Sequence, residues 1–147
     1  MAHVWHTARR PNGELQVADF ELRQMPDQPL AEGEVRVRNS WLSVDPYVRG
    51  LLDDEGSYMP TIPLGSEVPG GAVGEVVESR DAALPIGTVV WHEYGWRDSV
   101  ALPAEQCRPI RASAVPVQRF PGNLDMPGEP ARFGLLWWLV PRAGNRT

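Results

Sequence analysis

Lysine is absent from this chain, and cysteine is nearly so. All 14 basic residues are arginine, and they are spread along the chain rather than gathered in a stripe. Because the 19 acidic residues bring the formal net charge to −5, a nucleic-acid-binding surface is not expected. Cys107 is the one cysteine, which excludes an intrachain disulfide and favours a cytoplasmic protein.

Long apolar runs are also missing. Residues 1–10 contain no apolar stretch of the signal-peptide kind. The longest apolar run, 135–140, is too short to cross a bilayer. We therefore expect a soluble protein in the cytoplasm. At 147 residues the chain has the length of one domain and can bury a substantial core.

Turn-forming residues, by contrast, are abundant. The 15 prolines and 14 glycines separate short apolar segments, a pattern typical of short strands joined by turns. The alternation over 34–38 places Val35 and Val37 on a buried face and Arg36 and Arg38 outside. Mainly β structure with a closed or half-closed sheet is predicted. Further strands are expected over 14–20, 72–78, 88–91 and 98–102, helical turns over 46–52, and one longer helix over 131–139.

The segment 69–74 is a near miss to the dinucleotide-binding pattern G-x-G-x-x-G. Pro69 takes the place of the first glycine, and a β-branched strand follows instead of a helix N-terminus. The glycines are therefore predicted to serve the start of a strand or a bulge. A doubly wound nucleotide-binding domain would also need several helices between its strands, so no cofactor site is predicted within the chain.

A family resemblance rests on the segment 39–50, which reads N-S-W-L-S-V-D-P-Y-V-R-G. It resembles the signature Y-L-S-V-D-P-Y-M-R-G of the zinc-independent medium-chain dehydrogenases/reductases, and in particular of the leukotriene/prostaglandin reductases and alkenal double-bond reductases. Three further blocks resemble the family in the same order, at 62–79, 95–100 and 126–136. Trp41, Pro130 and Arg132 depart from the family pattern.

In that family a GroES-like, partly open β-barrel binds the substrate and precedes a Rossmann domain that holds NADPH. The resemblance therefore implies a GroES-like substrate domain over 1–125. Residues 126–147 would form a C-terminal helix and the lead-in to a Rossmann domain that the chain does not contain. NADPH is implied for full-length relatives, and no cofactor is expected to bind this chain alone.

The sequence does not favour a catalytic zinc site or a nucleophilic cysteine. Zinc-dependent relatives carry Gly-His-Glu where this chain has Gly65-Ser66-Glu67, so the ligating histidine is replaced by serine. No metal site is predicted, and His3 and His6 are expected to be a solvated pair. A nucleophilic Cys107 would need a nearby base and a lowered pKa, so a half-buried strand thiol is favoured.

The site candidates come from segments that line or border the substrate cleft in the family. Tyrosine and tryptophan can flank a planar enone and donate a hydrogen bond to its carbonyl oxygen. The catalytic candidates are Tyr47, Glu67 and Tyr58, and the substrate-binding candidates are Trp41, Arg49, His92, Tyr94, Trp96 and Met126.

Two of these candidates, Arg49 and Glu67, and the neighbouring Asp45 have structural alternatives to a role in the site. Asp45 before Pro46 favours helix capping over catalysis, and Arg49 could pair with Asp45 four residues earlier. Glu67 is bracketed by apolar residues, so burial could raise its pKa. It could equally satisfy backbone groups near the glycines.

The leading function is the substrate-binding half of an NADPH-dependent enone or alkenal reductase-like oxidoreductase. It would bind a small hydrophobic conjugated carbonyl compound and would not transfer hydride alone. The alternatives are a cofactor-independent cyclase or isomerase acting on a polyketide-like substrate, and a non-catalytic truncated remnant. The apolar segment around Trp137 and Trp138 predicts a homodimer or a partner chain, unless this helix folds back over the barrel mouth.

Overall fold

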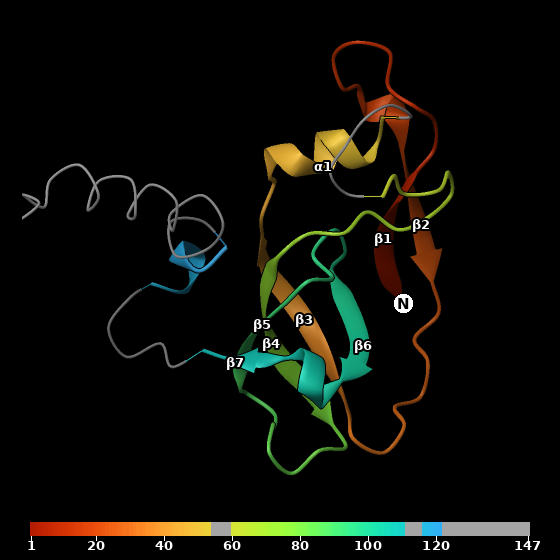
Figure 1. Cartoon of the computed structure of the whole chain (residues 1–147). Coiled ribbons are helices and arrows are strands. Elements are labelled where there is room, and N and C mark those ends of the chain that lie inside the picture. Colours follow the sequence, from red (N-terminus) through yellow and green to blue (C-terminus); the bar gives the residue numbers. More distant parts are fainter. Residues whose placement is uncertain (54–59, 111–115, 122–147) are drawn as a thin grey trace, which may run out of the picture.

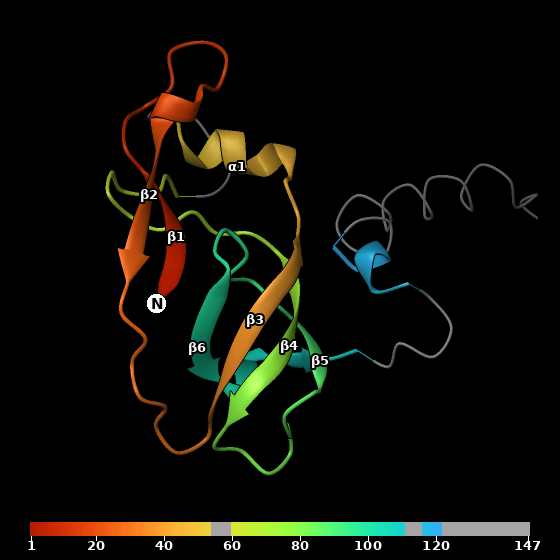
Figure 2. The same ribbon diagram turned by 180° about the vertical axis from the view of Figure 1, so that it is seen from behind.

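The computed structural model describes residues 1–53, 60–110 and 116–121. Its strands form a two-stranded sheet in the order β1-β2 and a five-stranded sheet in the order β6-β3-β4-β5-β7, with antiparallel pairing throughout. The helix α1 lies across the end of the sheets at which β3 finishes (Figures 1 and 2). The elements are β1 (Ala2–Thr7), η1 (Val17–Asp19), β2 (Phe20–Met25), β3 (Glu34–Leu42), α1 (Pro46–Leu51), β4 (Ala72–Ser79), β5 (Val89–His92), β6 (Ser99–Pro103), η2 (Ala104–Gln106), β7 (Arg108–Pro109) and η3 (Val117–Arg119).

β1 connects the two sheets through its second edge. Trp5 donates its backbone N–H to the carbonyl of Trp96 and accepts from the N–H of Val68, both at 2.9 Å, while Thr7 donates to Ser66. Two loops thus continue the sheet along β1. The strand β6 is at the edge of the five-stranded sheet, where it pairs with β3, and β1 belongs to the other sheet. Within the described residues β1 and β6 are therefore not paired as strands, and the barrel has a seam between them. The predicted GroES-like, partly open β-barrel is confirmed.

The core lies on the inner face of the curled five-stranded sheet. Val35 and Val37 of β3 are fully buried, as the alternation over 34–38 predicted. Each buried valine contributes about 1.5–3 kcal/mol relative to leaving the side chain exposed. The core cluster consists of Val35, Val37, Val76, Leu84, Val90, Val100, Leu102 and Cys107.

The strand predicted over 14–20 is wrong. The chain forms the 3-10 turn η1 there, and β2 begins only at Phe20. The reason is the buried carboxylate of Asp19, which accepts from the backbone N–H of Gln16 at 2.8 Å and from Arg9 Nε at 2.7 Å. Because this bonding closes a turn, Val17 is 82% exposed instead of facing a core.

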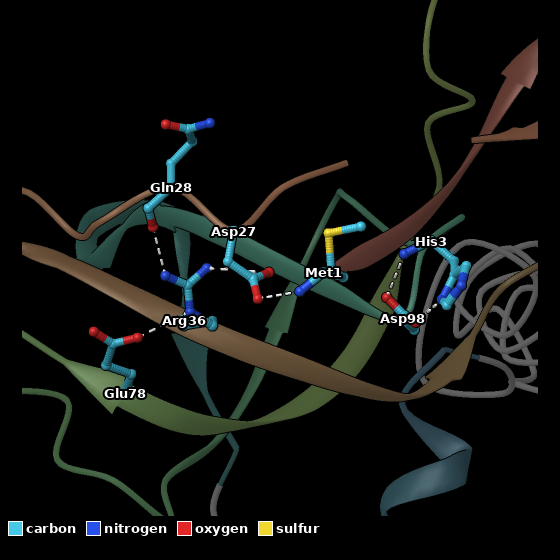
Figure 3. Close-up of polar contacts among 7 residues, drawn as sticks. All are labelled: Met1, His3, Asp27, Gln28, Arg36, Glu78 and Asp98. Atoms are coloured by element: carbon cyan, nitrogen blue, oxygen red, sulfur yellow. Dashed lines mark hydrogen bonds and ion pairs between the residues drawn. The ribbon is translucent and has the colours of Figure 1, made fainter. Parts of the chain in front are cut away.

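Arg36 is less exposed than predicted, because the segment between β2 and β3 lies over it. Its guanidinium donates to Glu78 at 2.9 Å and to the carbonyl of Gln28 at 2.6 Å. The N-terminal amine of Met1 binds Asp27 in the same cluster (Figure 3). These contacts fix the start of β1 and the segment before β3 against the sheet.

Several predictions fall on residues outside the described part of the chain. They concern the helix over 131–139, the boundary at 125/126, and the contact through Trp137 and Trp138. Among the residues that the structure does describe, no helix has the length and apolar character needed to span a membrane.

Candidate functional site

A cleft of about 390 Å³ lies beside α1 and the β5–β6 loop. The helix α1 contributes Tyr47 and Leu51 to its lining, and the segment before β4 contributes residues 67–71. The loop between β5 and β6 contributes further side chains. Its lining residues are Asp45, Tyr47, Leu51, Glu67, Val68, Pro69, Gly70, Gly71, Trp91, Glu93, Tyr94 and Arg97.

Two glycines allow the loops of the cleft to approach one another closely. A Cβ on Gly70 would lie 2.9 Å from Trp96 Cδ1, and one on Gly95 would lie 2.7 Å from the carbonyl oxygen of Gly70. Both positions therefore exclude larger residues. The strand β4 follows directly, as predicted for this glycine-rich segment.

The described residues do not fit the pyrophosphate of a dinucleotide. The glycine-rich segment leads into a strand, so it presents no helix N-terminus to a phosphate. The one α-helix of the described residues, α1, is six residues long and has the acidic Asp45 at its N-cap. A carboxylate at that position would repel a phosphate.

His92 holds the β5–β6 loop in place. Its Nδ1 accepts from the N–H of Tyr94 at 3.1 Å, so Nε2 carries the proton and donates to Asn39 Oδ1 at 2.9 Å. The Asn39 amide in turn donates to the carbonyls of Tyr94 and Arg97. Burial, with a smaller effect of the Arg97 charge, lowers the pKa of His92 to about 4. Both ring nitrogens of the neutral imidazole are therefore engaged within the fold.

Glu67 and Arg97 face each other across the cleft wall and form an ion pair. The guanidinium of Arg97 also lies 5.8 Å from the ring centroid of Tyr94, within cation–π range. The Glu67 side chain is 43% exposed, whereas that of Arg97 is 10% exposed. The buried setting expected for Glu67 is therefore wrong, and Arg97 is the buried partner.

Around α1, the predicted capping and pairing also differ from the structure. Asp45 occupies the N-cap position, but its side chain makes no capping bond and instead accepts from Ser43 Oγ at 2.6 Å. Arg49 pairs with Asp53 rather than with Asp45, and donates to the carbonyl of Gly13 at 3.0 Å. Asp45 thus keeps its carboxylate at the rim of the cleft.

The cleft brings together three of the predicted site residues, Tyr47, Glu67 and Tyr94. Tyr58 and Met126 lie outside the described residues. The remaining candidates do not line the cleft. Trp41 is half exposed on β3, and Arg49 pairs with Asp53 on α1. His92 is buried behind the β5–β6 loop, and Trp96 stacks on Phe20 in a separate apolar pocket, with 5.4 Å between the ring centroids.

Nine lining residues were not among the predicted site residues, and four of these nine carry charged or aromatic side chains: Asp45, Trp91, Glu93 and Arg97. The available signal was the family block at 95–100, in which Arg97 stands next to Trp96. Alternation from Trp96 would have placed Arg97 on the opposite face of the loop.

Histidine and cysteine make no metal site in the described residues, where no cluster of three potential ligands occurs. The solvated pair predicted for His3 and His6 is wrong for His6, which is buried and donates from Nδ1 to the carbonyl of Val4 at 3.1 Å. His3 is exposed and bonds to Asp98 at 2.7 Å. Cys107 is buried, and this burial raises the pKa of its thiol to about 11.

Comparisons with known proteins agree with the fold. Residues 3–110 match the family described as the N-terminal domain of oxidoreductase. The NADPH-dependent curcumin reductase of Escherichia coli (strain K12) is 34% identical, over 96% of this chain and 41% of its own length. The NADP(+)-dependent 2-alkenal reductase of Nicotiana tabacum is 35% identical, over 87% of this chain and 39% of its own length.

Among solved structures, CurA from Vibrio vulnificus superposes with a TM-score of 0.82 at 29% identity, covering 92% of this chain and 40% of that one. The chain therefore spans about 40% of the length of the relatives that it matches. The resemblance indicated by the segment 39–50 is confirmed.

Proposed function

The chain belongs to the family of N-terminal domains of oxidoreductases, and on this premise we propose that its cleft binds a small hydrophobic conjugated carbonyl compound. The chain would act as the substrate-binding domain of an NADPH-dependent reductase. The observation that carries the proposal is the meeting of Tyr47, Tyr94 and Trp91 around one cleft of about 390 Å³. A volume of that order suits a small ligand.

The walls of the cleft supply the groups that a planar enone requires. Trp91 and Tyr94 offer aromatic surface on one side, and Leu51 and Val68 offer apolar contacts. The phenol of Tyr47 is the group that we assign to the carbonyl oxygen, since a hydroxyl donor there both orients the ligand and withdraws electron density from its double bond. Tyr58 remains a second candidate for this role.

The charge around the cleft favours neutral ligands. Asp45, Glu67 and Glu93 contribute three carboxylates, and Arg97 contributes one cation that already pairs with Glu67. An anionic ligand would therefore meet net repulsion at the rim. A neutral enone, in particular one that carries hydroxyl donors, would meet acceptors instead.

The chain's own part in the reaction is to bind and orient the substrate. The described residues do not fit the dinucleotide, so hydride transfer is not assigned to them. Relatives named as NADPH-dependent curcumin and 2-alkenal reductases support the substrate class, because both names describe reduction of conjugated carbonyl compounds.

Thermal unfolding with added trans-4-phenyl-3-buten-2-one tests the proposal. The ligand should raise the melting temperature by mass action, by the equivalent of about 2.7 kcal/mol at a hundredfold excess over Kd. The saturated ketone of the same skeleton is the matched ligand control and should give a smaller shift.

Tyr47→Phe should weaken the shift more than Cys107→Ala does, because Cys107 is buried in the core away from the cleft. Equal effects of the two substitutions would contradict the role given to Tyr47. Conversion of the enone by the chain without NADPH would replace the binding role with that of a cofactor-independent isomerase or cyclase.

A further inference from the structure

The Glu67–Arg97 ion pair is a wall shared by two cavities. On one side it lines the cleft of about 390 Å³. On the other side the same two residues line a second cavity of about 300 Å³ at the seam between β1 and β6. The second cavity is bounded by Ala2 and Val4 of β1, Glu34 and Arg36 of β3, residues 99–101 of β6, and the segment 25–28.

The backbone places the two residues of this pair next to each other along β1. Glu67 forms a bridge opposite His6, and Arg97 forms a bridge opposite Val4. Residues directly opposite each other on antiparallel chains share a face, and Val4 and His6 are both buried. Glu67 and Arg97 lie opposite two positions of β1 that are two residues apart, so their side chains lie next to each other.

The pair is also held firmly. Backbone bonds from Trp5 to Trp96 and from Val68 to Trp5, both at 2.9 Å, anchor the two segments that carry it. Tyr94 packs on the guanidinium of Arg97 at 5.8 Å. Because the Arg97 side chain is 10% exposed, its stem and guanidinium supply most of the buried bulk of the wall.

We propose that Arg97, held by Glu67, is a specificity-determining partition that sets how long a substrate tail the cleft accepts. The proposal rests on the proposed function of the cleft as a binding site for conjugated carbonyls. With Arg97 in place, an alkyl tail that points towards β1 ends at the guanidinium. Without it, the tail continues into the cavity at the β1–β6 seam.

Arg97→Ala is the variant that opens the wall. Glu67 then loses its partner but is 43% exposed, so water can solvate its charge. Arg97→Met is the matched control, because methionine keeps an unbranched apolar stem in the wall and removes the charged guanidinium, whereas alanine removes the stem as well. The double variant Glu67→Ala/Arg97→Ala serves if Arg97→Ala does not fold, as judged by near-ultraviolet circular dichroism.

The experiment measures the affinity of the full chain for straight-chain trans-3-alken-2-ones that lengthen by one methylene at a time, by tryptophan fluorescence quenching. In the unsubstituted protein, affinity should rise roughly fourfold for each buried methylene and then stop rising at a length limit. In Arg97→Ala the rise should continue past that limit, so that the longest enones bind at least tenfold more tightly than they bind the unsubstituted protein. Arg97→Met, which keeps part of the bulk of the wall, should move the limit by less than Arg97→Ala does.

The outcomes separate the two proposals. If the unsubstituted protein binds no enone, the proposed function fails and the partition fails with it. If it binds short enones and Arg97→Ala shows the same length limit, the partition is refuted while the binding function stands. A limit that shifts equally in Arg97→Met would assign the effect to charge and would also refute the partition.

Discussion

The buried imidazole of His92 should make the stability of this protein fall between pH 7 and pH 5. Its side chain is fully buried, and its pKa is lowered from 6.5 to about 4. In the unfolded chain the imidazole takes up a proton as the pH falls through 6.5, whereas in the folded chain it stays neutral until about 4. The unfolded state therefore binds more protons in this window, and stability is full above pH 6.5 and is lost as the pH falls.

The size of the loss follows from the two pKa values. The imidazole has a pKa of 6.5 in the unfolded chain and of about 4 in the folded chain. Proton uptake by the unfolded chain therefore reduces the free energy of unfolding by about 2 kcal/mol on going from pH 7 to pH 5. Carboxyl groups with a lowered pKa do not account for this drop. Asp19, for example, loses its stabilising contribution only as the pH falls below its ordinary value of 3.8.

Urea denaturation at pH 7 and pH 5 measures the effect, and two histidine variants assign it. His92→Gln should be less stable at pH 7, because it loses the bond to Asn39, but its change between the two pH values should shrink to below about 0.5 kcal/mol. His3→Gln, at an exposed position, should retain the drop. An undiminished drop in His92→Gln, or a ring resonance of His92 that titrates near 6.5 in the native protein, would refute the reasoning.

Two further predictions rest on buried groups of the structure, and a third tests the association expected from the sequence. Burial raises the pKa of Cys107 from 9.0 to about 11, so native protein should react with iodoacetamide at pH 8 about a hundredfold more slowly than urea-unfolded protein; equal rates would contradict this. Gly74→Ala should cost about 1–3 kcal/mol in urea denaturation, because the new Cβ would lie 2.5 Å from the carbonyl oxygen of Arg38; an unchanged midpoint would count against the packing. Trp137→Glu with Trp138→Glu should turn a dimer into a soluble monomer in light scattering, and an unsubstituted protein that is already monomeric would reject the dimer.

Local patterns in the sequence predicted the sheet well. The alternation over 34–38 is a property of neighbouring residues, and a strand with one buried face follows from it directly. The start of β2 did not follow in the same way. The turn η1 depends on the burial of Asp19 against Arg9, ten residues earlier in the chain, and no alternation of apolar residues records such a contact.

The sequence indicated side chains that could line a cleft, but it did not indicate which way each of them faces. Tyr47, Glu67 and Tyr94 meet in the cleft, whereas Trp96 faces a different pocket beside Phe20. The β-bridge between Arg97 and Val4 fixes the orientation of the β5–β6 loop. This orientation determines that Tyr94 faces the cleft and Trp96 does not. That bridge joins residues far apart in the chain, so the orientation becomes visible only in the folded structure.

Nuclear magnetic resonance tests whether conjugated carbonyl compounds bind in the cleft between α1 and the β5–β6 loop. Backbone amide shifts of the full, isotopically labelled chain would be followed while trans-4-phenyl-3-buten-2-one is added. We expect the saturable changes to concentrate at Gly70, Gly71, Trp91 and Tyr94, which line the cleft. Changes concentrated instead around Trp5, Leu15 and Phe20 of the separate apolar pocket, or the absence of saturable changes, would contradict this expectation.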